Sequence, residues 1–208
     1  MTSHRSLFLL VVLLAFVAAG CGSDGSSSSG GGERKLSSRL VDLDAQPPLL
    51  NALDVDPKNG DYLLTTNKGF WRIDKDDKTV TQIKGTIAAG GKSDTVGTFL
   101  EIEVMPDGRL IGSGHPDNQN TLPQFLGFIE SDDLGKTWKV LARLGDADLH
   151  KIIPIHDKLY AFDAVLSALL ISDDGGKTFT ERFTPTGLII DFVVDPKDPN
   201  YILAATED

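Results

Sequence analysis

Short apolar stretches alternate with turn residues over most of this chain. Runs rich in β-branched and aromatic residues occur at 61–66, 79–83, 99–104, 158–162 and 201–206, and Gly, Pro, Asp or Asn bound most of them. Apolar residues at the i, i+3, i+4, i+7 spacing of an amphipathic helix are few after residue 37. The pattern therefore predicts an all-β chain of short strands joined by tight turns.

Four segments align with one another around a turn: 52–63, 101–111, 150–160 and 191–203. Each reads as a strand, a turn of Asp, Pro, Gly or Asn residues, and a second strand. Further strands follow each pair, so the repeating unit holds about four strands and about 40–50 residues, which is the size of one blade of a β-propeller.

A motif of the form Ser-x-Asp-x-Gly-x-Thr-aromatic occurs twice, and the second copy begins 41 positions after the first. Its residues are Ser131, Asp133, Gly135, Thr137 and Trp138, and again Ser172, Asp174, Gly176, Thr178 and Phe179. The motif resembles the Asp-box, or BNR repeat, of sialidases, sortilin-type receptors and photosystem II assembly factors. A degenerate copy at 73–80 has Lys75 where the Asp is expected.

The Asp-box resemblance implies a structural corner between the outer strands of a blade, away from the ligand-binding face. Asp and Ser side chains hold such turns through bonds to the local backbone, and Gly permits a positive φ. A calcium site is the other interpretation of the clustered carboxylates, but the EF-hand spacing is absent. We therefore expect no metal and no cofactor.

Segments 112–138, 148–163 and 193–208 resemble bacterial lipoproteins named as sialidase-like glycosylhydrolases. The resemblance implies an Asp-box β-propeller over residues 36–208, with about three and a half four-stranded blades. Because a closed propeller has about 4–8 blades, we expect an incomplete one. The favoured interpretation is a piece of a longer protein, and the alternative is assembly with another copy.

The amino-terminal region predicts a secreted, lipid-anchored protein. Arg5 precedes an apolar run at 7–19, which is shorter than a membrane span and typical of a signal peptide. "AAGC" resembles a lipobox, so residues 1–20 would be removed and Cys21 would carry lipid. The Gly/Ser-rich linker at 21–35 would give a reach of roughly 20 Å. The alternative is an ordinary secreted protein with one free thiol.

The net charge and the amino-terminal lipid anchor limit the classes of ligand and the location that we expect. The formal net charge of −10 argues against nucleic acid as a ligand. The expected location is the extracytoplasmic side of a bacterial membrane, reached through lipid on Cys21, and the expected ligand is a glycan or an envelope protein.

Candidate site residues lie near the channel that a propeller encloses. The alignment places Glu101, His150 and Asp191 at one position near the start of the innermost strand, and alternation places Glu103 on the same face as Glu101. These residues either form a site or simply line a wet channel. Ligand-binding candidates also come from the insertion at 112–124, namely His115, Asp117, Asn118 and Asn120.

The resemblance to sialidases also implies three arginines that hold a carboxylate, a Tyr–Glu nucleophile pair and an Asp acid/base. The "WRID" stretch at 71–74 is faintly similar to the family's arginine motif, but no nucleophile can be assigned. Hydrolysis of a glycoside requires two carboxyls, about 5–10 Å apart, for which Glu101, Glu103 and Asp191 are the candidates. Two hypotheses follow: a binding propeller, or an exo-sialidase-type hydrolase whose catalytic residues lie partly in further blades.

Overall fold

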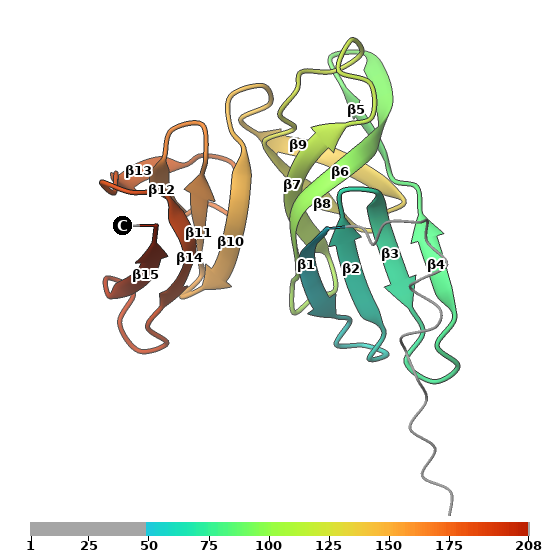
Figure 1. The fold of residues 1–208 in the computed structure, drawn as a ribbon, viewed down its shortest axis with the longest axis horizontal. Coiled ribbons are helices and arrows are strands. Elements are labelled where there is room, and N and C mark those ends of the chain that lie inside the picture. Colours follow the sequence, from blue (N-terminus) through green and yellow to red (C-terminus); the bar gives the residue numbers. More distant parts are fainter. Residues whose placement is uncertain (1–48, 208) are drawn as a thin grey trace, which may run out of the picture. The chain divides into compact units, whose positions relative to one another are not determined.

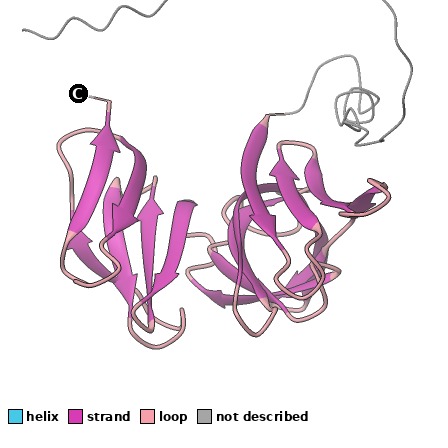
Figure 2. Cartoon of the chain, turned by 90° about the horizontal axis from the view of Figure 1, so that it is seen from below, coloured by secondary structure: helices cyan, strands magenta, loops and turns pink. Residues whose placement is uncertain are grey.

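The computed structural model describes residues 49–207, which consist of strands and loops with no helix (Figures 1 and 2). Contacts divide the chain into Met1–Arg34 and Lys35–Asp208, and every described strand belongs to the second unit. The predicted signal peptide, Cys21 and the linker lie outside the described residues, as does the start of the predicted blade region at 36–48.

Fifteen strands follow one another within residues 49–207. They are β1 (Leu50–Val55), β2 (Tyr62–Thr66), β3 (Gly69–Ile73), β4 (Val80–Ile83), β5 (Thr86–Ala89), β6 (Lys92–Val104), β7 (Leu110–Pro116), β8 (Phe128–Ser131), β9 (Thr137–Ala142), β10 (Leu149–Ile155), β11 (Lys158–Asp163), β12 (Ala168–Ser172), β13 (Thr180–Phe183), β14 (Ile189–Val194) and β15 (Ile202–Thr206).

These strands form three blades and half of a fourth, which confirms the predicted architecture. The first blade is the antiparallel sheet β1-β2-β3-β4, and the third is β10-β11-β12-β13. The second comprises the later part of β6 with β7, β8 and β9, and β14 pairs with β15 alone. The four aligned segments of the sequence supply the first two strands of each blade.

The second blade carries one strand that the four-strand repeat did not predict. β5 pairs antiparallel with the first part of β6 and parallel with β9, so that the sheet β5-β6-β7-β8-β9 closes on itself. Gly90 and Gly91, both at positive φ, make the hairpin turn between β5 and β6. Register shifts next to Thr98 and Phe99 accompany the change of partner along the long β6 strand.

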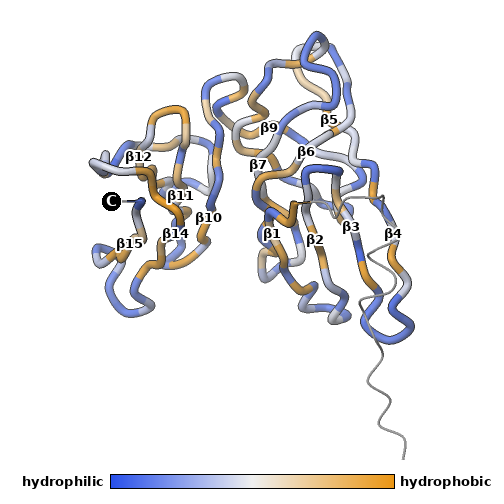
Figure 3. Tube along the Cα trace, in the orientation of Figure 1, coloured by the Kyte–Doolittle hydropathy of each residue, from blue (hydrophilic) through white to orange (hydrophobic). Residues whose placement is uncertain are grey.

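Apolar side chains pack between consecutive blades. Figure 3 shows hydrophobic positions gathered along the strands and hydrophilic ones in the turns. The first cluster joins the first and second blades through Leu63, Phe70 and Ile102, all at most 1% exposed. A second cluster lies between the second and third blades, and a third between the third blade and β14–β15. Each four-stranded sheet that has two neighbours thus buries both of its faces.

The two Ser-x-Asp motifs form the β8–β9 and β12–β13 turns. Ser172 Oγ donates to Asp174 Oδ1 at 2.8 Å and accepts from the Gly176 amide at 2.9 Å. The Asp174 carboxylate accepts from both the amide and the hydroxyl of Thr178, at 2.9 and 2.6 Å. The hydroxyl of Thr178 is the main cause that lowers the pKa of Asp174 to about 2. The other copy repeats these bonds.

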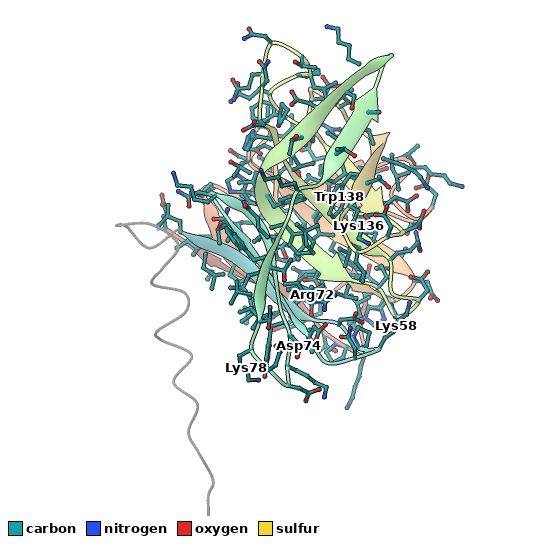
Figure 4. The ribbon with its side chains drawn as sticks, turned by 90° about the vertical axis from the view of Figure 1, so that its right-hand side faces the viewer. Lys58, Arg72, Asp74, Lys78, Lys136 and Trp138 are labelled. Atoms are coloured by element: carbon teal, nitrogen blue, oxygen red, sulfur yellow. The ribbon has the colours of Figure 1, made fainter. Side chains whose placement is uncertain are left out.

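The degenerate copy also forms the corresponding turn, between β3 and β4. Asp74 Oδ1 accepts from the amides of Asp76 and Asp77, at 2.9 and 3.0 Å. Figure 4 shows Asp74 and Lys78 at this turn, and Lys136 and Trp138 beside the β8–β9 turn. Trp138 Nε1 donates to the Gly135 carbonyl at 2.9 Å, so the buried indole is tied to its own corner.

Two adjacent glycines in the second motif provide a matched test of this corner. Both have positive φ, but a Cβ on Gly176 would lie 2.0 Å from the buried Phe128 ring, whereas a Cβ on Gly175 would meet nothing within 4 Å. We expect Gly175→Ala to lower the free energy of unfolding by about 1 kcal/mol through backbone strain. Gly176→Ala should lower it by about 3 kcal/mol, since ring displacement is added. Equal losses in urea denaturation would contradict this account.

Candidate functional site

The strand order separates two ends of the blades. The Ser-x-Asp motifs lie in turns between third and fourth strands. Because consecutive strands are antiparallel, the turns between second and third strands lie at the opposite end, together with the starts of the first strands. We name this opposite end the loop end; it is where the predicted ligand-binding loop at 112–124 lies.

A pocket of about 590 Å³ opens at the loop end of the first two blades. The β2–β3 turn, the bend in β6, and the end of β7 with the loop after it form its walls. Its polar side chains are Asn67, Lys68, Thr98, His115, Asp117, Gln119 and Gln124. We call it the loop-end pocket.

Only some of the residues predicted to bind ligand lie at the loop-end pocket. His115 and Asp117 line the loop-end pocket, whereas Asn118 and Asn120 do not. The side-chain oxygen of Asn118 accepts from the Asn120 amide at 3.0 Å, and the Asn118 amide donates to Asp94 at 3.2 Å. Those two asparagines therefore shape the loop.

One ring nitrogen of His115 is held by a hydrogen bond, and the other lies near a carboxylate. Nδ1 is 2.8 Å from the Gln124 carbonyl, and Nε2 is 3.5 Å from Asp148 Oδ1. The other oxygen of Asp148 lies 3.1 Å from Nε2 of His150, the third-blade residue that the repeat alignment selected. The hydrogen bond from His150 to Asp148 raises the pKa of His150. One carboxylate thus links histidines from β7 and β10.

A second group of polar side chains lies on the first strands β6, β10 and β14. Glu101 and Glu103 of β6 are hydrogen-bonded to each other, and Glu101 is only 5% exposed. Lys151 of β10 attracts both carboxyls, and its Nζ is 3.8 Å from Oδ1 of Asp191 on β14. Asp54 of β1 adds repulsion on Glu103. The structure therefore brings the three predicted carboxylate candidates into one cluster, which we call the channel carboxyls.

Burial is the main cause of the raised pKa values of Glu101 and Glu103. It raises the pKa of Glu101 to about 8 and that of Glu103 to about 7. Near neutral pH one carboxyl can donate a proton while the other accepts one. However, their direct hydrogen bond places them closer than the roughly 5–10 Å at which a glycosidase separates its two carboxyls.

Three of the four arginines within residues 49–207 form ion pairs elsewhere. Arg72 pairs with Asp61 at 3.1 Å, Arg143 with Asp163 at 3.4 Å, and Arg109 with Asp107 and Glu130. These separate ion pairs do not make the arginine triad that the sialidase resemblance implies. Within residues 49–207, no group of three or more His, Asp or Glu side chains is placed to hold a metal ion.

The described part of the chain contains no helix that is long and apolar enough to cross a membrane.

Sequence reasoning missed several residues around the loop-end pocket. Asn67 and Lys68 come from the first blade, and Asp148 comes from the connection into the third. They are ordinary polar loop residues in the sequence, so only the stacking of the blades selects them. Gln119 and Gln124 lie in the predicted ligand-binding loop at 112–124. That insertion was the feature of the sequence from which these two pocket residues could have been predicted.

No protein-family model matches this chain, and no curated protein matches it in sequence. A gluconolactonase from Xanthomonas campestris aligns with a TM-score of 0.55 at 17% identity, over 76% of this chain and 56% of its own. YCF48 bound to D1 peptide aligns with a TM-score of 0.45 at 16% identity, over 78% of this chain and 49% of its own. A Hadza microbial sialidase aligns with a TM-score of 0.38 at 17% identity, over 71% of this chain and 36% of its own.

The chain therefore spans about half the length of the gluconolactonase that it matches. Together with the blade topology, that similarity shows the fold: this chain is an all-β propeller. At such low identity the similarity extends to the fold alone.

The channel carboxyls predict a pH-dependent stability. Glu101 has a pKa of about 8 in the folded state against an ordinary 4.5, so its stabilising contribution is complete below pH 4.5 and is lost as the pH rises through 8. Glu101→Gln stays neutral, so we expect the Tm to rise by roughly 5 °C at pH 9 and to change little at pH 4.5.

The control for this measurement is Glu181→Gln, which replaces an exposed glutamate on β13. It should shift the Tm by less than about 1 °C at both pH values. A rise for Glu101→Gln that is equally large at pH 4.5 and pH 9 would show that ionisation of Glu101 is not the cause.

Proposed function

We propose that this chain is a glycan-binding propeller of the bacterial cell envelope. The observation that supports the proposal is the loop-end pocket of about 590 Å³, whose side chains are almost entirely polar. Ligand pockets of this size are usually lined mostly by apolar groups. A pocket lined by amide, carboxylate, hydroxyl and imidazole groups instead suits a ligand covered with hydroxyls, because each hydroxyl both donates and accepts hydrogen bonds.

The pocket is also held in shape before any ligand arrives. His115 is hydrogen-bonded to the loop backbone, its Nε2 lies 3.5 Å from Asp148, and the centroid of its ring is 5.7 Å from that of Phe125. Gly97 has no side chain where the Asp117 backbone approaches to 2.7 Å of the position that a Cβ would take. Such preorganisation lowers the entropy lost on binding.

Lipid on Cys21 and the linker at 21–35 would tether the propeller roughly 20 Å from the membrane. That layout suits a protein that collects glycans at the cell surface. The tether is tested by Cys21→Ser, which should move the chain from the membrane fraction to the soluble one. Membrane association that the substitution leaves unchanged would contradict the tether.

The channel carboxyls favour a second candidate, an exo-sialidase-type glycoside hydrolase. The pKa values of about 8 and 7 suit a proton donor and acceptor at neutral pH. Binding alone is the stronger proposal, because Glu101 and Glu103 are hydrogen-bonded to each other and Arg72 and Arg143 form other ion pairs. Release of 4-methylumbelliferone from its sialoside, abolished by Glu101→Gln, would favour the hydrolase instead.

A glycan microarray that includes neutral and sialylated saccharides tests the binding function. We expect binding to a subset of the saccharides. In titration calorimetry with the strongest of them, Asp117→Ala should weaken the affinity at least tenfold, since a charged hydrogen-bond partner is lost. The control is Asp132→Ala, an exposed aspartate in the β8–β9 turn at the opposite end. Absence of binding, or equal effects of the two substitutions, would contradict the proposal.

A further inference from the structure

The hydrogen bond of His115 decides which of its ring nitrogens carries a hydrogen. Nδ1 lies 2.8 Å from the carbonyl oxygen of Gln124. A carbonyl oxygen only accepts hydrogen bonds, so Nδ1 must donate and must carry the hydrogen. Because a neutral imidazole carries a hydrogen on one nitrogen alone, Nε2 of the neutral ring is a bare acceptor.

Nε2 of His115 faces a second acceptor. It lies 3.5 Å from Oδ1 of Asp148, beyond the roughly 2.7–3.2 Å of an N–H···O hydrogen bond. This oxygen is buried and accepts no hydrogen bond from the described residues. A buried acceptor without a donor costs free energy, and the neutral ring has no donor to offer it. A proton on Nε2 would supply the donor and would place an imidazolium beside a carboxylate.

Asp148 already has a donor on its other oxygen. Oδ2 lies 3.1 Å from Nε2 of His150, and this hydrogen bond raises the pKa of His150. His150 lies on β10 of the third blade, whereas His115 lies on β7 of the second. Asp148 is therefore joined to the third blade, and its remaining oxygen faces the second.

Two further charged groups belong to this cluster. Asp163 of β11 is 0% exposed, accepts from the Asp148 amide at 3.2 Å and also raises the pKa of His150. Arg143, which follows β9, pairs with Asp163 at 3.4 Å. Because these two charges offset each other, Asp148 carries the charge that remains.

The pocket side of His115 adds no net charge. Thr98 of β6, which pairs with His115, is uncharged. Asp117 and Lys68, which line the loop-end pocket, carry one charge of each sign. The Asp148 carboxylate is therefore the charge that a proton on His115 would meet.

We propose that proton uptake on Nε2 of His115 locks the wall of the loop-end pocket to the third blade and so strengthens ligand binding. The inference rests on the proposed function, because it concerns the same pocket. The neutral ring holds the loop alone, through Gln124, whereas the protonated ring also holds Asp148. Fixing His115 before a ligand arrives lowers the entropy lost on binding. Histidine side chains change charge within about pH 5–8, so binding should be tighter at acidic pH than at alkaline pH.

Long-range proton–nitrogen NMR of the full chain, labelled with ¹⁵N-histidine and free of ligand, tests the lock by itself. The chain has four histidines, so His115→Gln and His150→Gln assign the signals. At about pH 8 we expect the hydrogen of His115 on Nδ1 and that of His150 on Nε2, and on acidification His115 should gain its second hydrogen on Nε2. A neutral His115 with its hydrogen on Nε2 would overturn the proposal, because Asp148 would then have its donor without proton uptake.

Asp148→Asn removes the carboxylate and keeps the shape of the side chain. It should shift the titration midpoints of His115 and His150 to lower pH, because neither imidazolium then meets a carboxylate. The control is Asp146→Asn, an exposed aspartate two residues earlier in the same connection, and it should leave both midpoints unchanged. A His115 midpoint that is the same in the two variants would also overturn the proposal.

Apparent dissociation constants on the glycan microarray, measured at about pH 5.5 and about pH 8, test the effect on binding. We expect the unaltered chain to bind about tenfold more tightly at the lower pH, which is the scale of one charged hydrogen bond. Asp148→Asn should reduce this difference to less than about twofold, whereas Asp146→Asn should retain it. Equal affinities of the unaltered chain at the two pH values would overturn the lock and leave the binding function standing. Absence of binding at both would contradict the binding function, and the NMR titration then decides the lock alone.

Discussion

The structure depends on one constraint: both faces of each blade are apolar and must pack against another sheet. Sheets with one solvated face alternate apolar and polar residues along a strand. Here, adjacent residues such as Leu110 and Ile111 are both buried, one toward the first blade and the other toward the third. Each blade therefore requires a neighbouring sheet on either side, and this stacking continues through all the described blades.

This stacking explains where chemistry can lie. Side chains between blades are committed to the core, and the Ser-x-Asp corners occupy one end. The loop end and the first strands remain. There the structure brings together His115, Asp148 and His150 in one group and the channel carboxyls in another. Each group is assembled from different blades. A change in how the blades pack would therefore alter the candidate sites as well as the stability.

The sequence predicted the architecture well because the repeat is encoded locally. Tight turns, alternating residues and two corner motifs define the strands without any knowledge of their neighbours. The β5 hairpin was missed because its parallel pairing with β9 joins Thr86 to Thr137, far along the chain. Alternation correctly placed Glu101 and Glu103 on one face. Their contact with Lys151 and the role of Asp148 depend on inter-blade packing, which a single sequence does not display.

Hydrogen–deuterium exchange of the chain, read by mass spectrometry, tests the central claim most directly. If packing between blades sustains each sheet, the inner strands with covered faces, β6–β7 and β10–β11, should be protected longest. β1 and β14–β15, with one uncovered face each, should exchange at least tenfold faster. Protection of β1 and β14–β15 that equals that of β6–β7 and β10–β11 would contradict the account, because it would show that each sheet is stable without its neighbours.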